Sequence, residues 1–249
     1  MTRRVNNLEE QKSEKNTLLQ QEVEQKQLLN TELKHKDHLV SQLKKQEGRL
    51  RSDLKRKTRY KRQLSKKIEK TILEQIAAAK SAARKYKQAQ AAAKKPAKGS
   101  KNPVLNAMNF NSSRAFSAQK GKLMSPIYQG TVVGYYGRRN HPLFKDVIVN
   151  NNGIDIKGQY NSVVRNVFEG VVVSIFTVPG LNNAVMVKHG DYYTTYSNIA
   201  KVYVRKGDRL KTGGQIGTIG RDTNAGGHVL HFEIWRNKSK QNPSSWIKF

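Results

Sequence analysis

The sequence predicts an N-terminal α-helical coiled coil followed by a mostly antiparallel β domain. Residues 1–95 contain one glycine, Gly48, and no proline, and their apolar side chains recur at helical spacing. From residue 123 onward, short β-branched and aromatic runs alternate with turns rich in Gly, Asn and Asp. We therefore expect a coiled-coil helix over 1–95, a linker or regulatory segment over 96–122 and a β domain over 123–249.

The predicted coiled coil depends on an apolar seam with alternating spacings of four and three residues. The same register also passes through polar residues such as Lys36 and Glu47, so the seam is interrupted. An amphipathic helix of this length has too little core of its own, so it needs a partner. That partner could be a preceding helix, a second copy or another protein. The seam consists of Leu29, Leu33, Val40, Leu43, Leu50, Leu54, Leu64 and Ile68.

The segment 96–122 breaks the helical periodicity with Pro, Gly, Asn and Ser, and a short docking segment could lie within it at 104–116. After it come "GTVVGYYG", "NAVMVKHGDYYTTYSN" and "VLHFEIW", which read as strands. Residues after 122 contain no helix-period segment of useful length. The last 125 or so residues therefore predict a compact β domain.

Charge and composition narrow the classes of partner. The chain has 47 Lys and Arg against 18 Asp and Glu, which gives a net charge of +29 and favours anionic partners such as cell wall, lipid head groups or nucleic acid. It has no cysteine, which excludes disulfides and thiolate chemistry. It also lacks an apolar run long enough to span a bilayer and an N-terminal signal-peptide core. An extracytoplasmic location would therefore require an export signal upstream of this chain.

The strongest basic run lies at 51–67, and a solvated helix face is its simplest interpretation. Contact with anionic cell wall or membrane is the first alternative, and nucleic acid is the second. The run has one aromatic residue, Tyr60, and the chain carries no recognisable nucleic-acid-binding module. We therefore expect no nucleic-acid partner.

Several motifs of the β domain occur together in a diagnostic order. They are "GRRNHP", "NNGIDI", "VKHGDYYTTYSN", "VRKGDRLKTGGQIGTIG" and "LHFEI", followed by a closing "NPSSW". In this order and spacing, residues 124–249 resemble a LytM-type domain, the lysostaphin-like zinc endopeptidase fold that cuts peptidoglycan cross-links.

The resemblance implies five site positions, and most of them have lost their chemistry. The family's three zinc ligands correspond to Asn151, Asp155 and His231, and its two assisting histidines correspond to Asn198 and Val229. A neutral amide is a poor zinc ligand beside imidazole, and valine cannot transfer a proton. We therefore predict no bound zinc, no other cofactor and no catalytic residue.

A one-residue shift could in principle restore a histidine to the site. His228 precedes Val229, but alternation along a strand places Val229 and His231 on one face and His228 on the other. His141 and His189 match family positions that do not bind metal. Residual zinc endopeptidase activity would require Asn151 or His228 as a ligand, and it remains the enzyme alternative.

Degenerate LytM domains preceded by a long coiled coil resemble the EnvC-type murein hydrolase activators. The resemblance implies that an empty groove binds a helix of an N-acetylmuramoyl-L-alanine amidase and relieves its autoinhibition during daughter-cell separation. It further implies docking of the coiled coil to the FtsE–FtsX division complex, occlusion of the groove by a segment of the chain, and a periplasmic or extracytoplasmic location. The chain lacks most of the usual first coiled-coil arm, which places the FtsX contact in doubt.

The predicted groove surrounds the former metal site. Strand alternation places Val229, His231 and Trp235 on one face, and Tyr196 on the same face as Asn198. An apolar and aromatic groove with a few polar groups suits an amphipathic helix. The candidate partner-binding groove consists of Asn151, Asp155, Tyr196, Asn198, Val229, His231 and Trp235.

The same residues also allow simpler interpretations than a partner-binding groove. Asp155 and His231 could be packing relics or a weak metal site, and Trp235 could serve core packing alone. The whole chain could also be a passive basic protein that binds peptidoglycan or nucleic acid. Pelleting with cell-wall sacculi without an effect on amidases would favour passive peptidoglycan binding, and salt-sensitive DNA binding would favour nucleic acid.

Overall fold

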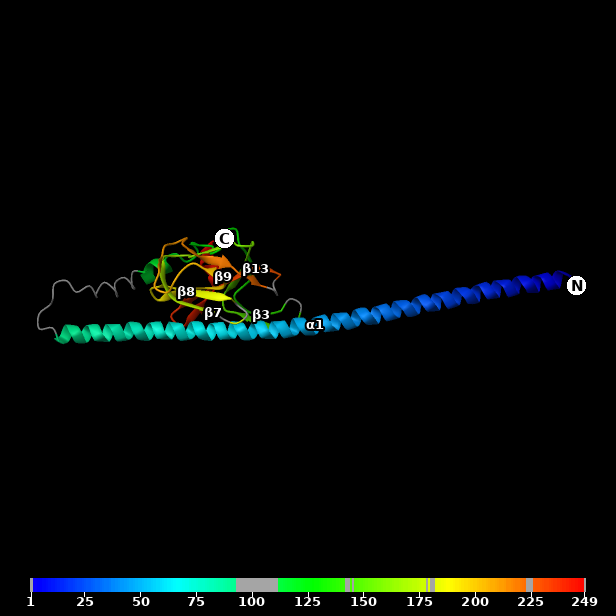
Figure 1. Ribbon diagram of the computed structural model, residues 1–249, viewed down its shortest axis with the longest axis horizontal. Coiled ribbons are helices and arrows are strands. Elements are labelled where there is room, and N and C mark those ends of the chain that lie inside the picture. The colour runs from blue at the N-terminus through cyan, green and yellow to red at the C-terminus, as the bar shows by residue number, and fades with distance from the viewer. Residues whose placement is uncertain are drawn as a thin grey trace. The chain divides into compact units, whose positions relative to one another are not determined.

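The computed structural model describes residues 2–92, 112–141, 144, 146–177, 179, 182–222 and 226–248. One long helix, α1 (Thr2–Ala92), precedes a β domain that begins at Leu123 (Figure 1). This confirms the predicted fold class of a long helix followed by a mostly antiparallel β domain. The chain divides into two compact units, Met1–Lys55 and Arg56–Phe249. Residues 96–111 of the predicted linker, and most of its docking segment at 104–116, lie outside the described residues.

The first compact unit is a single helix whose apolar side chains face solvent. Leu29, Leu33, Leu43 and Leu50 are each about half exposed or more. They belong to the predicted seam, and their pairing in a coiled coil stays a prediction. Along the described residues, no helix combines the length and the apolar character needed to cross a membrane.

The second compact unit contains the strands. Their bounds are β1 (Leu123–Met124), β2 (Thr131–Gly134), β3 (Gly137–Asn140), β4 (Ile148–Asn151), β5 (Ile154–Gly158), β6 (Val163–Arg165), β7 (Gly170–Thr177), β8 (Asn183–His189), β9 (Tyr192–Val202), β10 (Arg209–Leu210), β11 (Gln215–Ile219), β12 (Arg221–Asp222), β13 (Gly227–Arg236), β14 (Ser239–Gln241) and β15 (Ile247–Lys248). A short 3₁₀ helix, η1 (Pro243–Ser245), precedes β15.

The main sheet has the order β10-β7-β8-β9-β13-β5-β2, and each neighbouring pair in it is antiparallel. Strand β13 lies between β9 and β5, and its residues from Val229 to Trp235 are all buried. Both faces of this strand are covered, which explains why its sequence is almost continuously apolar and aromatic. In its register, His231 lies opposite Asp155 on one side and Ser197 on the other.

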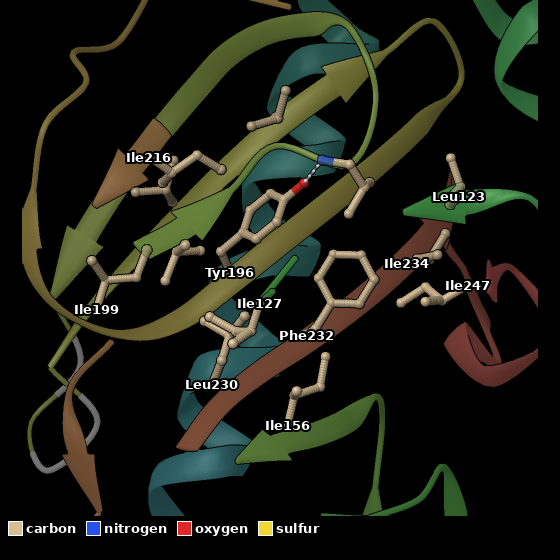
Figure 2. Close-up of a cluster of buried hydrophobic side chains, with 14 of the residues drawn as sticks. Leu123, Ile127, Ile156, Tyr196, Ile199, Ile216, Leu230, Phe232, Ile234 and Ile247 are labelled. Carbon is tan, nitrogen blue, oxygen red and sulfur yellow. Dashed lines mark hydrogen bonds between the residues drawn. The ribbon is translucent and has the colours of Figure 1, made fainter. Parts of the chain in front are cut away.

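One face of the sheet, which we call the core face, carries the main hydrophobic cluster (Figure 2). Phe232 and Tyr196 pack there with ring centroids 5.2 Å apart. The Tyr196 hydroxyl accepts a hydrogen bond from the Val167 backbone N–H at 3.0 Å and donates one to Asn166 Oδ1 at 3.1 Å. The core face therefore combines apolar packing with polar groups that find partners inside the domain.

The described end of the predicted linker also packs on the core face. Residues 112–117 form a helical turn that buries Phe116 completely. The Phe116 ring stacks on His189 at 4.8 Å and on Tyr192 at 4.9 Å between centroids. The Ser113 hydroxyl accepts a hydrogen bond from the Asp191 backbone N–H at 2.8 Å. These contacts fix the chain where it enters the β domain.

Residues 57–76 of α1, which we call the docked segment, cover the opposite face of the sheet, the covered face. Leu64, Ile68 and Ile72 are at most 1% exposed, because they pack against side chains of β7, β8, β9 and β13. Leu64 and Ile68 also belong to the predicted coiled-coil seam. The structure buries them on the sheet, because the β domain presents an apolar surface of its own. The apolar partners on the sheet are Val173, Phe176, Ala184, Met186, Tyr193 and Trp235.

Candidate functional site

The covered face brings together the three positions that correspond to the family's metal ligands. Asn151 ends β4, Asp155 lies in β5, and His231 lies opposite Asp155 in β13. The turn between β4 and β5 needs Gly153, since a Cβ there would lie 2.1 Å from the Phe232 carbonyl oxygen. His231 Nδ1 lies 2.7 Å from Asp155 Oδ1, and the Asn151 amide donates to Asp155 Oδ2 at 3.0 Å.

Both ring nitrogens of His231 are engaged with carboxylates. Nε2 lies 2.9 Å from Glu233 Oε1, and the other oxygen of Glu233 accepts a hydrogen bond from Trp235 Nε1 at 2.7 Å. His231 is therefore held between two carboxylates, and it donates to both of them when its ring is protonated. Burial and Lys61 lower the pKa of His231, but the charge of Asp155 and the hydrogen bonds to Asp155 and Glu233 outweigh them and raise it.

This arrangement is unfavourable for a metal. Zinc would have to displace Asp155 or Glu233 from a nitrogen of His231, and at Asn151 it would meet only a neutral amide. Among the described residues, no group of three or more His, Cys, Asp or Glu side chains is arranged to hold a metal ion. The polar cluster satisfies itself through hydrogen bonds between its own members.

Lys61 of the docked segment brings a positive charge to this cluster. Its ammonium nitrogen lies 3.2 Å from Asp155 Oδ2, and it lies 3.4 Å from Asp155 Oδ1 and from Asn151 Oδ1. Burial raises the pKa of Asp155, but Lys61 and His231 lower it more strongly, so the pKa lies well below its usual range. The positive charge next to Asn151 and Asp155 therefore comes from a lysine of the same chain.

Two further polar contacts align the docked segment with the site. The Asn152 amide donates to the Ser65 hydroxyl at 2.5 Å. Lys57, one helical turn before Lys61, forms an ion pair with Asp222 at 2.5 Å. Lys57, Lys61 and Ser65 were not among the predicted site residues.

Asn198 has a structural role that strand alternation did not reveal. Its backbone φ is +70°, and the register between β8 and β9 shifts at this point. Its amide donates to the carbonyl oxygens of Gly220 at 3.0 Å and Val229 at 2.6 Å. Because the bulge interrupts the alternation, the prediction that Tyr196 shares a face with Asn198 is wrong, and Tyr196 belongs to the core face.

Two other predicted groove residues are buried, and one of them, Trp235, packs against the docked segment. Trp235 is fully buried among the apolar residues of the covered face. Val229 is 5% exposed, in line with its place on β13. His228 packs edge-to-face against Tyr160, with ring centroids 5.4 Å apart, and pairs with Gly158 and Arg221 in the sheet.

The covered face also contains two buried hydroxyl groups. Thr195 Oγ1 and Ser197 Oγ are buried without a hydrogen-bond partner among the described residues. In the register of β9 and β13 they lie opposite Glu233 and His231, next to the polar cluster. Buried hydroxyls nearly always find partners in stable interiors, so this surface is packed less completely than the core face.

Comparison with known proteins relates the β domain to a known protein family. Residues 149–243 match the family model described as Peptidase family M23. The chain is 35% identical over 98 residues to Peptidoglycan DD-endopeptidase ShyA of Vibrio cholerae serotype O1, which covers 39% of this chain and 23% of that protein. It is 31% identical over 99 residues to Murein hydrolase activator NlpD of Salmonella typhimurium, with 39% and 26% covered.

A third relative is Cell division protein DipM of Caulobacter vibrioides, which is 28% identical over 117 residues and is matched over 46% of this chain and 18% of that protein. The chain thus spans about a quarter or less of the length of these three relatives. One of them is named as an endopeptidase, one as a murein hydrolase activator and one as a cell division protein. Residues 149–243 are therefore similar to Peptidase family M23, in agreement with the LytM-type motifs of the sequence.

Proposed function

We propose that this protein is a non-catalytic activator of peptidoglycan amidases, of the EnvC type, that binds the amidase through the covered face. The observation that carries the proposal is that both nitrogens of His231 are in contact with carboxylates, on a face that already packs against an amphipathic helix. Such a surface is suited to binding a protein helix. The similarity to proteins named murein hydrolase activator and cell division protein supports the same reading.

The docked segment occupies the surface that the amidase would use. Leu64, Ile68 and Ile72 lie on one side of a helix and insert into an apolar surface, which is the helix-in-groove mode of recognition. An amidase helix would have to displace this segment. The resting chain would then be a weak activator, and release of the segment would make it a strong one.

The remaining partners follow from the same proposal. The exposed seam in residues 29–50 of α1 would pair with another helix and transmit a signal from the FtsE–FtsX complex. The strongly basic chain would also be attracted to anionic peptidoglycan. The location would be periplasmic or extracytoplasmic, and no zinc or other cofactor would take part.

The test is release of dye from labelled peptidoglycan by the full chain, alone and with a division amidase. The variant Ile68→Asp with Ile72→Asp should release the docked segment, because it places two charges in an apolar interface. We expect no release by either protein alone, weak stimulation of the amidase by the unmodified chain and strong stimulation by the variant. Glu69→Asp, on the exposed side of the helix, is the matched control.

A residual zinc endopeptidase is the second candidate, favoured by the retained Asp155 and His231 and by the match to an endopeptidase. It predicts release of dye by the chain alone, dependent on zinc. Asp155→Ala and His231→Ala should abolish that release. Such a result would replace the proposal of an activator with that of an enzyme.

A further inference from the structure

The polar cluster of the covered face has a charge balance that the β domain does not complete by itself. Two carboxylates, Asp155 and Glu233, flank the single imidazole of His231. Even with His231 protonated, the β-domain part of the cluster lacks one positive charge to balance its two carboxylates. Lys61 supplies that charge at 3.2 Å from Asp155, with both side chains about one-fifth exposed.

Removal of a cation from this position is costly. A largely buried carboxylate that loses its ionic partner keeps the cost of its desolvation without the compensating attraction. Asp155 would be left with His231, which it shares with Glu233. Any helix that takes the place of the docked segment must therefore bring a cation to Asp155 or leave the carboxylate poorly compensated.

The cation and the apolar contacts are in register on one helix. Lys61 precedes Leu64, Ile68 and Ile72 by three, seven and eleven residues, which places all four on one side of an α-helix. A helix can contact Asp155 with a cation and cover the apolar surface at the same time only if its basic residue lies three positions before the first of these apolar residues. The combination is more restrictive than an apolar stripe alone.

The docked segment is an imperfect occupant of this surface. The buried hydroxyls of Thr195 and Ser197 gain no hydrogen bond from it among the described residues. A helix that offered polar partners to these hydroxyls would gain interactions that α1 lacks. A competing helix that forms hydrogen bonds with these two hydroxyls would therefore bind more tightly than the docked segment does.

We propose that the covered face selects helices that carry Lys or Arg at the position of Lys61, followed by apolar residues three, seven and eleven positions later. Asp155 recognises the basic residue of the helix, and the apolar residues around Trp235 recognise its apolar side chains. The inference deepens the proposed function, and the identity of the natural partner as an amidase rests on that function. The selectivity itself is a property of the β domain and is tested without an amidase.

The test measures binding of fluorescent peptides by anisotropy. The peptides comprise residues 54–78, and the receptor is the full chain with Ile68→Asp and Ile72→Asp, whose own segment is released. We expect the Lys61→Met peptide to bind about tenfold more weakly than the unmodified peptide, and Lys61→Arg to bind within about threefold. Met keeps the length and apolar character of lysine and removes only the charge. Arg62→Met, at an exposed position, is the matched control and should bind unchanged.

A receptor that also carries Asp155→Asn separates the charge pair from other effects. Against this receptor the difference between the unmodified and Lys61→Met peptides should shrink to about twofold, because no carboxylate remains to be compensated. Equal binding of both peptides to the first receptor would overturn the proposal. A tenfold difference that persists with Asp155→Asn would assign the selectivity to another residue and overturn it as well.

A second measurement uses the intact chain and does not require the receptor variant. Lys61→Met should accelerate hydrogen exchange in the docked segment, whereas Arg62→Met should leave it unchanged. Unchanged exchange in Lys61→Met would contradict the proposal. If exchange in Lys61→Met is accelerated as expected but the variants do not stimulate the amidase, the proposed function is wrong and the selectivity for a basic helix stands.

Discussion

The two faces of the central sheet are both buried, yet they are built differently. On the core face Tyr196 has hydrogen-bond partners, and Phe232 packs among apolar side chains. On the covered face an ion-pair cluster around Asp155 and His231 lies beside an apolar surface, and the hydroxyl of Ser197 has no partner among the described residues. The first combination is typical of a folding core and the second of an interface. Burial alone does not distinguish them.

The largest expected effect lies on the core face. Phe232→Ala should destabilise the β domain by about 3–5 kcal/mol, because it leaves a cavity in a fully buried cluster. Urea unfolding followed by tyrosine and tryptophan fluorescence measures this cost. A cost no larger than that of a substitution in the docked segment would remove the proposed difference between the faces.

Two histidines should show opposite pH dependence. His189, on the core face, donates from Nδ1 to the Glu169 carbonyl oxygen, and its Nε2 lies 2.8 Å from Thr194 Oγ1. Burial lowers its pKa to about 4. Because the unfolded state takes up a proton first, the stability that His189 contributes is present above pH 6.5 and is lost as the pH falls to about 4, by roughly 3 kcal/mol.

His231 should behave in the reverse way. Its pKa is raised in the folded protein, so its contribution is fully present below the unfolded value and is lost as the pH rises through the folded pKa. NMR titration of the imidazole protons separates the two residues. A neutral His231 at pH 6 or a charged His189 at pH 6 would contradict the assigned roles.

The docked segment should respond locally. Ile68→Ala should weaken its attachment by about 2 kcal/mol, while the unfolding of the β domain changes much less, because the helix can detach without exposing the core face. Hydrogen exchange by mass spectrometry distinguishes the two events. The exposed Glu69→Ala serves as control. Equal loss of protection in α1 and β13 would show that the segment is part of the fold's core.

The smallest effects compare two buried hydroxyls. Tyr196→Phe should cost about 1–3 kcal/mol, because it leaves polar partners at Val167 and Asn166 without their hydrogen bonds. Ser197→Ala should change the stability by less than about 0.5 kcal/mol, because it removes a hydroxyl that has no partner among the described residues. Thermal unfolding of both variants checks the pair. A larger cost for Ser197→Ala would indicate that this hydroxyl is satisfied.

Much of this architecture could be predicted from local patterns. The scarcity of proline and glycine predicted α1, and the resemblance to LytM-type domains implied that Asn151, Asp155 and His231 lie at one site. Strand alternation correctly separated His228 from His231. These inferences succeed because helix and strand periods are fixed by backbone geometry.

The rest depended on contacts that are distant in sequence. Alternation failed at Asn198, because a bulge with positive φ adds one residue to β9 and reverses the face of its neighbours. The covering of the site by Lys61 was also missed. A signal was present, since the apolar spacing changes from alternating four and three to successive fours at Leu64, Ile68 and Ile72. A change of period indicates a change of packing partner.

The most direct test of this account locks the docked segment in place. The chain has no cysteine, so Ser65→Cys with Asn152→Cys creates a unique pair at a contact of 2.5 Å, which a reducible crosslinker can join. Amidase stimulation is then measured before and after reduction, with each single-cysteine variant as control. We predict that the crosslinked protein does not stimulate the amidase and that reduction restores stimulation. Equal stimulation in both states would contradict the claim that the covered face is the amidase-binding surface.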